Sequence, residues 1–170
     1  DGATRVRAGV VIVPPSLMAG APGPIIEHMY DVRSLLRVAQ PAEAAPVPLA
    51  VEAVAAGFPS PAQDYWDGDV DLNEHLIRNR PATFVVRVAG DSMEGAGIFD
   101  GDELIVDRSL EPGEGDVVIA VVEGELTVKR LRLGPDGPRL HPANDAYPVL
   151  RPRELTVWGV VTTCLHHLHR

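Results

Sequence analysis

Short runs of Val, Ile, Leu and Thr, separated by glycine and proline, dominate the second half of the chain and restrict what it can fold into. Turn residues separate the runs, and Glu123-Gly124 predicts a tight hairpin, because glycine tolerates the positive φ that such turns require. Strands joined by short turns pair antiparallel, so residues 68–170 are predicted to form a compact, mostly β domain. Five runs have the composition of β-strands: 84–88, 103–107, 116–122, 125–133 and 156–163.

The first 56 residues are rich in Pro, Ala and Gly instead. The whole chain holds 16 Pro and 16 Gly, which argues against long helices. Residues 25–38 have apolar residues at helical spacing and are predicted to form a helix, as are residues 70–78. No second helix follows residues 25–38 across a tight turn, so a helix-turn-helix DNA reader is not supported. We expect an extended, flexible N-terminal arm and not a domain.

Charge and cysteine content restrict the class of protein. The formal net charge is −9, whereas a protein that grips DNA phosphates directly normally has a basic face. The single cysteine excludes an internal disulfide and fits a reducing compartment. The best apolar run, residues 8–13, is far shorter than the roughly 20 residues that span a bilayer. We therefore expect a cytoplasmic protein without direct DNA binding or membrane insertion.

A serine on a bend and the only lysine of the chain form the strongest candidate for a catalytic pair. Ser92 follows one predicted strand and precedes a glycine-rich turn, where backbone N–H groups can face a developing oxyanion. Lys129 stands on another predicted strand, with Leu131 as its neighbour on the same face. Burial there disfavours the ammonium form, so lysine can act as a neutral base, which arginine cannot. A serine in a β-turn and a solvated lysine on a strand are both common without catalysis. Neither residue alone therefore indicates a catalytic site, and only the pair does.

Other arrangements of reactive side chains carry less weight. A Ser-His-Asp triad would need His75 or His141 beside Ser92, which does not stand in a Gly-x-Ser-x-Gly turn. Three acidic residues match no known cation loop and are expected to solvate turns and strand ends: Asp100, Asp102 and Asp107.

Cysteine and histidine crowd the C-terminus and suggest a metal site. Their spacing is irregular and no second acidic ligand stands among them, so a frayed polar tail is the favoured interpretation. No metal or other cofactor is expected. The residues are Cys164, His166, His167 and His169.

Several motifs follow one another in a fixed order. They are Gly90-Asp91-Ser92-Met93, Asp100-Gly101-Asp102, and the segments 104–107, 115–120 and 124–129. Together they closely resemble the peptidase domain of the LexA/UmuD family of self-cleaving proteins. Upstream, the segments 56–61, 64–65 and 71–73 resemble the UmuD-like members in particular. The resemblance covers about residues 48–161.

The resemblance implies a mechanism and a fold. It makes Ser92 the nucleophile and Lys129 the neutral general base, with backbone N–H groups of Asp91 and Ser92 as the oxyanion hole. It also implies a scissile bond between Ala56 and Gly57. The chain would then divide into an arm, residues 1–56, and a peptidase domain that is the product, residues 57–170.

The residues around Ala56–Gly57 suit such a bond. Ala-Gly also occurs at 8–9, 19–20, 89–90 and 96–97. The last two flank the nucleophile and cannot easily present their carbonyls to it, whereas the first two remain possible for a flexible arm. Only Ala56–Gly57 has apolar residues just before it, a small residue at the cut, and a glycine that lets the backbone bend into a cleft.

The resemblance further implies a role in the SOS response to DNA damage. A RecA nucleoprotein filament would stimulate the cut. The product would join an error-prone Y-family DNA polymerase, similar to UmuC, in translesion synthesis. A homodimer is expected, with residues 157–163 a candidate for its interface.

Three alternatives remain at this point. A LexA-like or phage repressor is disfavoured by the missing helix-turn-helix. A signal-peptidase-like enzyme acting on other proteins normally needs a membrane anchor, which the sequence does not predict. A non-catalytic binding module that keeps only the fold is the third.

Overall fold

The computed structural model describes residues 5–7, 10–12, 32–37, 46–50 and 66–168. These residues fall into two compact units, one formed by residues 1–38 and 79–170 and the other by residues 39–78. The fold is mostly antiparallel β-sheet, as predicted. Within the described ranges, no helix is long and apolar enough to cross a membrane.

A nine-stranded sheet forms the larger unit. Its main path has the order β10-β9-β8-β11-β7-β6-β3, and β2 adds to β11 in parallel while pairing with β1. The strands are β1 (Arg5–Arg7), β2 (Val10–Ile12), β3 (Val32–Arg37), β6 (Thr83–Val88), β7 (Glu103–Asp107), β8 (Val117–Val122), β9 (Glu125–Gly134), β10 (Gly137–His141) and β11 (Leu155–Leu165).

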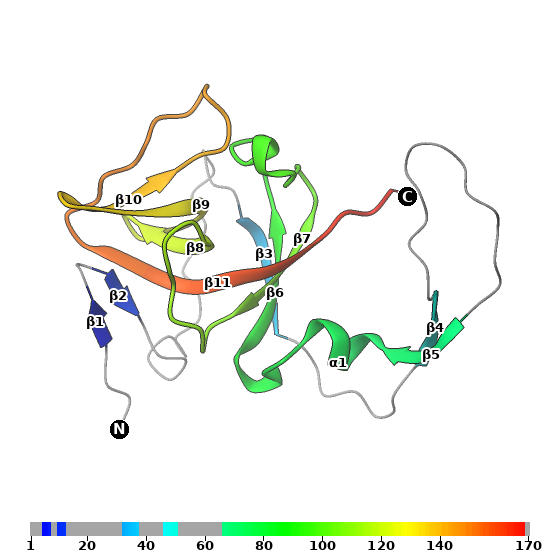
Figure 1. The fold of residues 1–170 in the computed structure, drawn as a ribbon. Coiled ribbons are helices and arrows are strands. Elements are labelled where there is room, and N and C mark those ends of the chain that lie inside the picture. Colours follow the sequence, from blue (N-terminus) through cyan, green and yellow to red (C-terminus); the bar gives the residue numbers. More distant parts are fainter. Residues whose placement is uncertain (1–4, 8–9, 13–31, 38–45, 51–65, 169–170) are drawn as a thin grey trace. The chain divides into compact units, whose positions relative to one another are not determined.

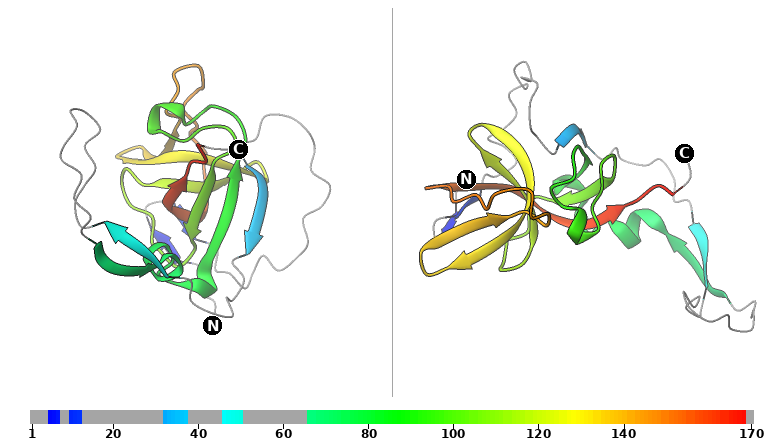
Figure 2. Two further views of the ribbon diagram at one scale, coloured as in Figure 1. Left: turned by 90° about the vertical axis from the view of Figure 1, so that its right-hand side faces the viewer. Right: turned by 90° about the horizontal axis from the view of Figure 1, so that it is seen from above.

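The long strand β11 joins the two halves of this sheet. Its first part pairs with β8, its second part pairs with β7, and the register shifts once in each pairing. Figure 1 shows β11 running from the group β8–β10 toward β6 and β7, and the right-hand view in Figure 2 shows the same path from above. The shifts let one strand bend between two sets of partners, as β-bulges do.

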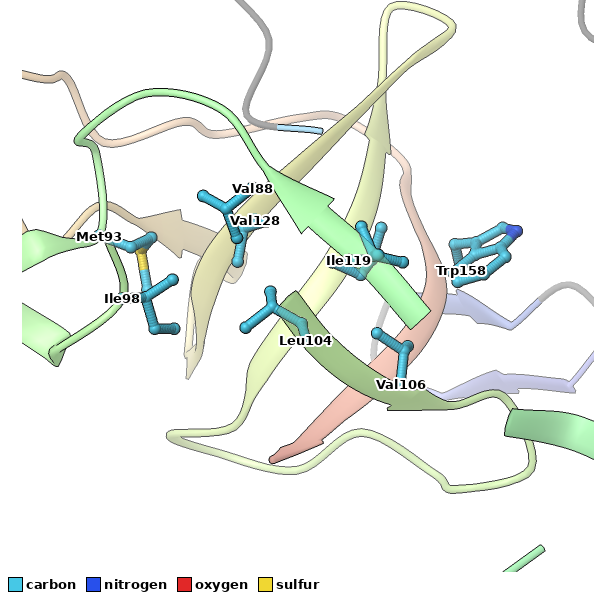
Figure 3. Packing of buried hydrophobic residues seen from close by; sticks show 9 residues of the cluster. Val88, Met93, Ile98, Leu104, Val106, Ile119, Val128 and Trp158 are labelled. Carbon is cyan, nitrogen blue, oxygen red and sulfur yellow. The ribbon is translucent and has the colours of Figure 1, made fainter. Parts of the chain in front are cut away.

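Two hydrophobic clusters form the core of this unit. One includes Met93, Leu104, Ile119, Val128 and Trp158, and Figure 3 shows this cluster extending from Met93 at one end to Trp158 at the other. The other cluster consists of Val118, Ala120, Leu131, Leu140, Leu155, Val157 and Val160. Val128 and Leu131 of β9 stand three residues apart, so they lie on opposite faces of the strand. They belong to different clusters because both faces of β9 are covered.

All five strands predicted for the second half are confirmed, within a residue or two at their ends. The hairpin between β8 and β9 is also confirmed, and Glu123 and Gly124 both have positive φ, 52° and 89°. In the same half of the chain, strand β10 was missed. Pro138 lies in it, and proline lowers strand propensity; β10 is tolerated because it is an edge strand of the sheet.

The predicted helix at residues 25–38 is wrong over its described part. Residues 32–37 form strand β3, which pairs antiparallel with β6; residues 25–31 lie outside the described residues. Pairing with a distant strand overrides local spacing here. The expected arm thus contributes β1, β2 and β3 to the sheet.

The smaller unit holds a two-stranded sheet and one short helix. Strand β4 (Pro46–Ala50) pairs antiparallel with β5 (Trp66–Asp71), and α1 (Leu72–Leu76) follows directly. The Asp71 side chain caps this helix by accepting a hydrogen bond from the Asn73 N–H at 2.8 Å. The predicted helix at 70–78 therefore exists in a shorter form.

Candidate active site

Ser92 lies on a tight turn between β6 and β7. Gly90 has a φ of 92°, a conformation that favours glycine, and its N–H donates to the Asp100 carboxylate at 2.8 Å. The Met93 side chain is buried in the core and anchors the turn. As a result Ser92 is held in place and is only 1% exposed.

Lys129 reaches Ser92 from β9. Its Nζ lies 2.8 Å from Ser92 Oγ, 3.0 Å from Thr127 Oγ1 and 2.9 Å from the Val128 carbonyl oxygen. Lys129 is 5% exposed, so this lysine is buried among oxygens and not solvated on the surface of a strand. Strand β9 presents Thr127 and Lys129 on one face because they stand two residues apart.

This arrangement suits proton transfer from the serine to the amine. A neutral amine has two N–H groups and one lone pair. If the N–H groups donate to Thr127 and to the Val128 carbonyl, the lone pair is directed at the Ser92 hydroxyl. A buried serine with a base in hydrogen-bond reach, itself oriented by a third group, is the usual arrangement for nucleophilic catalysis. Thr127 was missed in the sequence, although its position two residues before the lysine could have indicated it.

The backbone around Ser92 is also held. The Asp91 carbonyl oxygen accepts a hydrogen bond from the Glu94 N–H at 3.2 Å, and the Ser92 carbonyl oxygen accepts one from the Ala143 N–H at 2.8 Å. Asp91 and Ser92, expected as oxyanion donors, therefore lie in a turn whose peptide planes are constrained. The loop that includes Ala143 was not identified from the sequence.

The acidic residues expected in turns do bond to the backbone there. Asp107 accepts from the Ser109 N–H at 2.7 Å. Asp102 is buried and accepts from the Phe99 N–H at 2.8 Å. Burial alone would raise the pKa of Asp102, but hydrogen bonds from Phe99, His166 and Cys164 outweigh it, so the pKa lies below its usual value.

The expectation of a frayed C-terminal tail is wrong as far as His167, whose Nε2 lies 3.5 Å from Glu103 Oε2. Strand β11 continues to Leu165, and His166 Nδ1 lies 2.5 Å from Asp102 Oδ1. The Cys164 thiol donates to the same carboxylate at 3.4 Å; burial and Asp102 raise its pKa to about 11. A buried carboxylate that attracts two donors explains why the tail is ordered.

No group of three or more His, Cys, Asp or Glu side chains suited to a metal ion occurs among the residues from 69 to 168 whose side chains are described. His141 ends strand β10, where it pairs with Arg130, and His75 belongs to the smaller unit. The nitrogen beside Ser92 Oγ is the Lys129 amine. The expected scissile bond, Ala56–Gly57, lies outside the described residues.

Comparison with known proteins gives consistent matches. A family model described as peptidase S24-like matches residues 48–162. Protein SamA of Salmonella typhimurium is 51% identical over 119 residues, which cover 70% of this chain and 84% of SamA. Protein MucA of Escherichia coli is 45% identical over 123 residues, covering 70% and 84%. The LexA repressor of Alcanivorax borkumensis is 41% identical over 98 residues, covering 58% of this chain and 48% of that repressor.

Proposed function

The chain belongs to the peptidase S24-like family, as a UmuD-like member of the LexA/UmuD group of serine peptidases, and from this premise we propose that it cuts its own backbone once, between Ala56 and Gly57. Ser92 is the nucleophile and Lys129 is the general base. The single observation that carries the proposal is the 2.8 Å contact between Lys129 Nζ and Ser92 Oγ, made by two buried side chains.

The chemistry follows from this contact. The neutral Lys129 amine takes the Ser92 proton while Oγ attacks the Ala56 carbonyl carbon. Backbone N–H groups near Asp91 and Ser92 stabilise the oxyanion. The resulting ammonium returns its proton to the leaving Gly57 nitrogen, which breaks the peptide bond and leaves an ester between Ala56 and Ser92. Water then hydrolyses that ester and regenerates Ser92.

The choice of bond is supported by the extent of the family match. The match begins at residue 48, so it includes Ala56–Gly57 and excludes the Ala-Gly pairs at 8–9 and 19–20. The remaining pairs, at 89–90 and 96–97, flank Ser92 itself. Ala56–Gly57 is thus the one Ala-Gly pair that lies in the matched region and away from the nucleophile.

The proposed biological role follows from the UmuD-like relatives. A RecA nucleoprotein filament stimulates the cut in the cytoplasm, arm 1–56 is removed, and a homodimer of product 57–170 serves an error-prone UmuC-like polymerase. The acidic charge of the chain supports protein partners over direct DNA binding. A repressor role is the alternative, since a LexA repressor is among the relatives; a gel-shift assay with SOS promoter DNA would reveal it.

Intact-mass spectrometry tests the cut directly. Incubation at mildly alkaline pH or with RecA filaments should yield a fragment that begins Gly57-Phe58-Pro59. The variants Ser92→Ala and Ala56→Trp should stay whole, the second because the subsite admits only a small side chain. A fragment beginning at Gly20, cleavage of Ser92→Ala, or no cut of the wild type under any condition would reject the proposal.

A further inference from the structure

The loop formed by residues 143–147 is bound to the nucleophile turn through the backbone. The Ala143 N–H donates to the Ser92 carbonyl oxygen at 2.8 Å, and the Gly95 N–H donates to the Ala143 carbonyl oxygen at 2.8 Å. A Cβ at position 95 would lie 2.3 Å from that oxygen. Only glycine therefore allows the loop to approach so closely.

Two side chains of this loop hold Asp91, the residue before the nucleophile. Asn144 Nδ2 donates to the Asp91 carbonyl oxygen at 3.1 Å and lies 3.4 Å from its carboxylate. The Tyr147 hydroxyl donates to the other carboxylate oxygen. The Ala146 N–H donates to Asn144 Oδ1 at 3.0 Å, which fixes the orientation of the Asn144 amide. A hydroxyl bound to a carboxylate forms one of the stronger hydrogen bonds of proteins.

These contacts determine where backbone N–H groups point. In a planar trans peptide the C=O and the following N–H point in opposite directions. Asn144, by holding the Asp91 carbonyl, therefore sets the direction of the Ser92 N–H. Ala143, by holding the Ser92 carbonyl, sets that of the Met93 N–H in the same way. Donors fixed in advance stabilise an oxyanion more than donors that must reorient during the reaction.

We propose that Asn144 and Tyr147 are positioning residues for self-cleavage, which hold Asp91 so that the Ser92 N–H is directed at the oxyanion. The inference rests on the proposed function. Neither side chain touches the reacting atoms, and both act through Asp91. Their contribution is distinct from that of Thr127, which orients the Lys129 amine.

Single substitutions measure this contribution. Asn144→Ala and Tyr147→Phe should each lower the maximal cleavage rate by about 10- to 100-fold, the usual cost of misplacing reacting groups. The pH at half-maximal rate should stay that of the wild type, because the Ser92–Lys129 contact is intact. The thermal unfolding midpoint of each variant shows whether the protein was folded when its cleavage rate was measured.

Two variants away from the turn serve as matched controls. Asn79→Ala removes an amide bound to Ser109 Oγ, and Thr162→Val removes a hydroxyl bound to the Ile105 carbonyl oxygen. Both should cleave at the wild-type rate. If Asn144→Ala and Tyr147→Phe also did so while Ser92→Ala stayed whole, the positioning role would be rejected and the proposed function retained.

A double-substitution cycle tests whether Tyr147 acts through the Asp91 carboxylate. In an Asp91→Ala background, Tyr147→Phe should slow cleavage by less than twofold, since its partner is already gone. Multiplicative losses would overturn the inference.

NMR relaxation gives a readout without cleavage. In the cleavage-dead Lys129→Ala protein, the Ser92 N–H should have an order parameter near the rigid value of about 0.85, and Asn144→Ala should lower it. An unchanged order parameter would also reject the positioning role, whatever the outcome for the function.

Discussion

The Lys129 amine lies within hydrogen-bond distance of oxygens of Ser92, Thr127 and Val128. An ammonium group can donate to all three, whereas the neutral amine can donate to two and accept from the third. The same contacts therefore accommodate the proposed base both before and after it takes the proton. Arginine offers no such pair of states, because it does not lose its proton in proteins.

Replacement of the base by arginine is the sharpest test at this scale. Lys129→Arg keeps the positive charge but should reduce cleavage by about 100-fold or more at every pH, the usual contribution of a general base. Timed gels across a pH series compare this variant with the wild type.

The neighbouring strand residue provides the control for this substitution. Arg130 Nη1 donates to the Gly115 carbonyl oxygen at 2.8 Å, and Arg130→Lys should leave cleavage unchanged. An active Lys129→Arg protein would contradict the assigned role of the lysine.

Residues on a recognisable motif could be predicted from the sequence, and residues that act through distant contacts could not. Ser92 and Lys129 stood out by type and by motif order. Asn144 reaches Asp91 across 53 positions of the sequence, and a turn-like Pro-Ala-Asn-Asp run does not indicate that contact. The role of Asp102 in a turn was predicted, but its contacts with Cys164 and His166 at the end of β11 were not, because they join positions more than 60 residues apart.

Among the elements, β11 has the most demanding position. It passes close to β7 at Gly159, where an added Cβ would lie 2.6 Å from Val106 Cγ1 and 3.2 Å from Arg108 Cγ. The adjoining Trp158 carbonyl accepts from Arg108 Nε at 3.1 Å, and the Arg108 guanidinium packs over the Trp158 ring. Burial lowers the pKa of Arg108, a cost of enclosing this cation between the strands.

Gly159→Ala should therefore destabilise the sheet. Overpacking of this kind costs about 1–3 kcal/mol in the free energy of unfolding. Gly113→Ala is the matched control, because its Cβ would meet nothing closer than an Asp116 oxygen at 3.5 Å. Urea unfolding of the three proteins gives the comparison, and equal midpoints for both variants would refute the close approach of β11 and β7.

The contacts of Asp102 with Cys164 and His166, at the end of β11, make the free energy of unfolding depend on pH. The pKa of Asp102 is lowered in the fold, so its carboxylate stabilises the protein above the unfolded value of 3.8, and this contribution is lost as pH falls through the lower folded value. The difference in unfolding free energy between wild type and Asp102→Asn should thus shrink from about pH 5 downward.

Denaturant titrations at several pH values measure this difference. Asp136→Asn serves as the control, because that side chain is 78% exposed and its surface ion pair with Arg139 contributes little to stability. A difference for Asp102→Asn that stays constant with pH would mean that the carboxylate is not stabilised by its partners.

Strands with their own apolar pattern were predictable, whereas strands that depend on a partner were not. β7 and β8 each have a run of buried apolar residues, and β9 buries Val128 and Leu131. β10 contains Pro138 and exists as an edge strand beside β9. β3 has helix-like spacing and is a strand because β6 offers it an edge.

At the scale of the whole molecule, the proposed cut separates β2 from β11 and β3 from β6. The arm, residues 1–56, would leave. Strand β6 would then become an edge strand, and β11 would lose its parallel neighbour β2. An exposed strand edge is a ready site for pairing with another chain.

Hydrogen exchange before and after cleavage tests this consequence. Amides in β6 that face β3, those of Val85 and Arg87, should exchange faster in the purified product than in the uncut Ser92→Ala protein, whereas Val88 donates on the other side, to the Asp102 carbonyl oxygen. Amides of β9, which has β8 and β10 on its two sides, should not change. Equal protection of β6 in both forms would mean that β3 does not shield it in solution.

The burial of the only lysine also makes the protein its own probe of local breathing. An acylating reagent for amines can attack just two kinds of group here, an α-amino group and Lys129, whose amine is enclosed and bonded to Ser92, Thr127 and Val128. Acylation at Lys129 must wait for β9 and the nucleophile turn to part. Its rate, relative to that of a free amine, therefore reports the equilibrium constant for that opening. Slower acylation on addition of a partner would mean that the partner closes the site. Faster acylation would mean that it loosens the site.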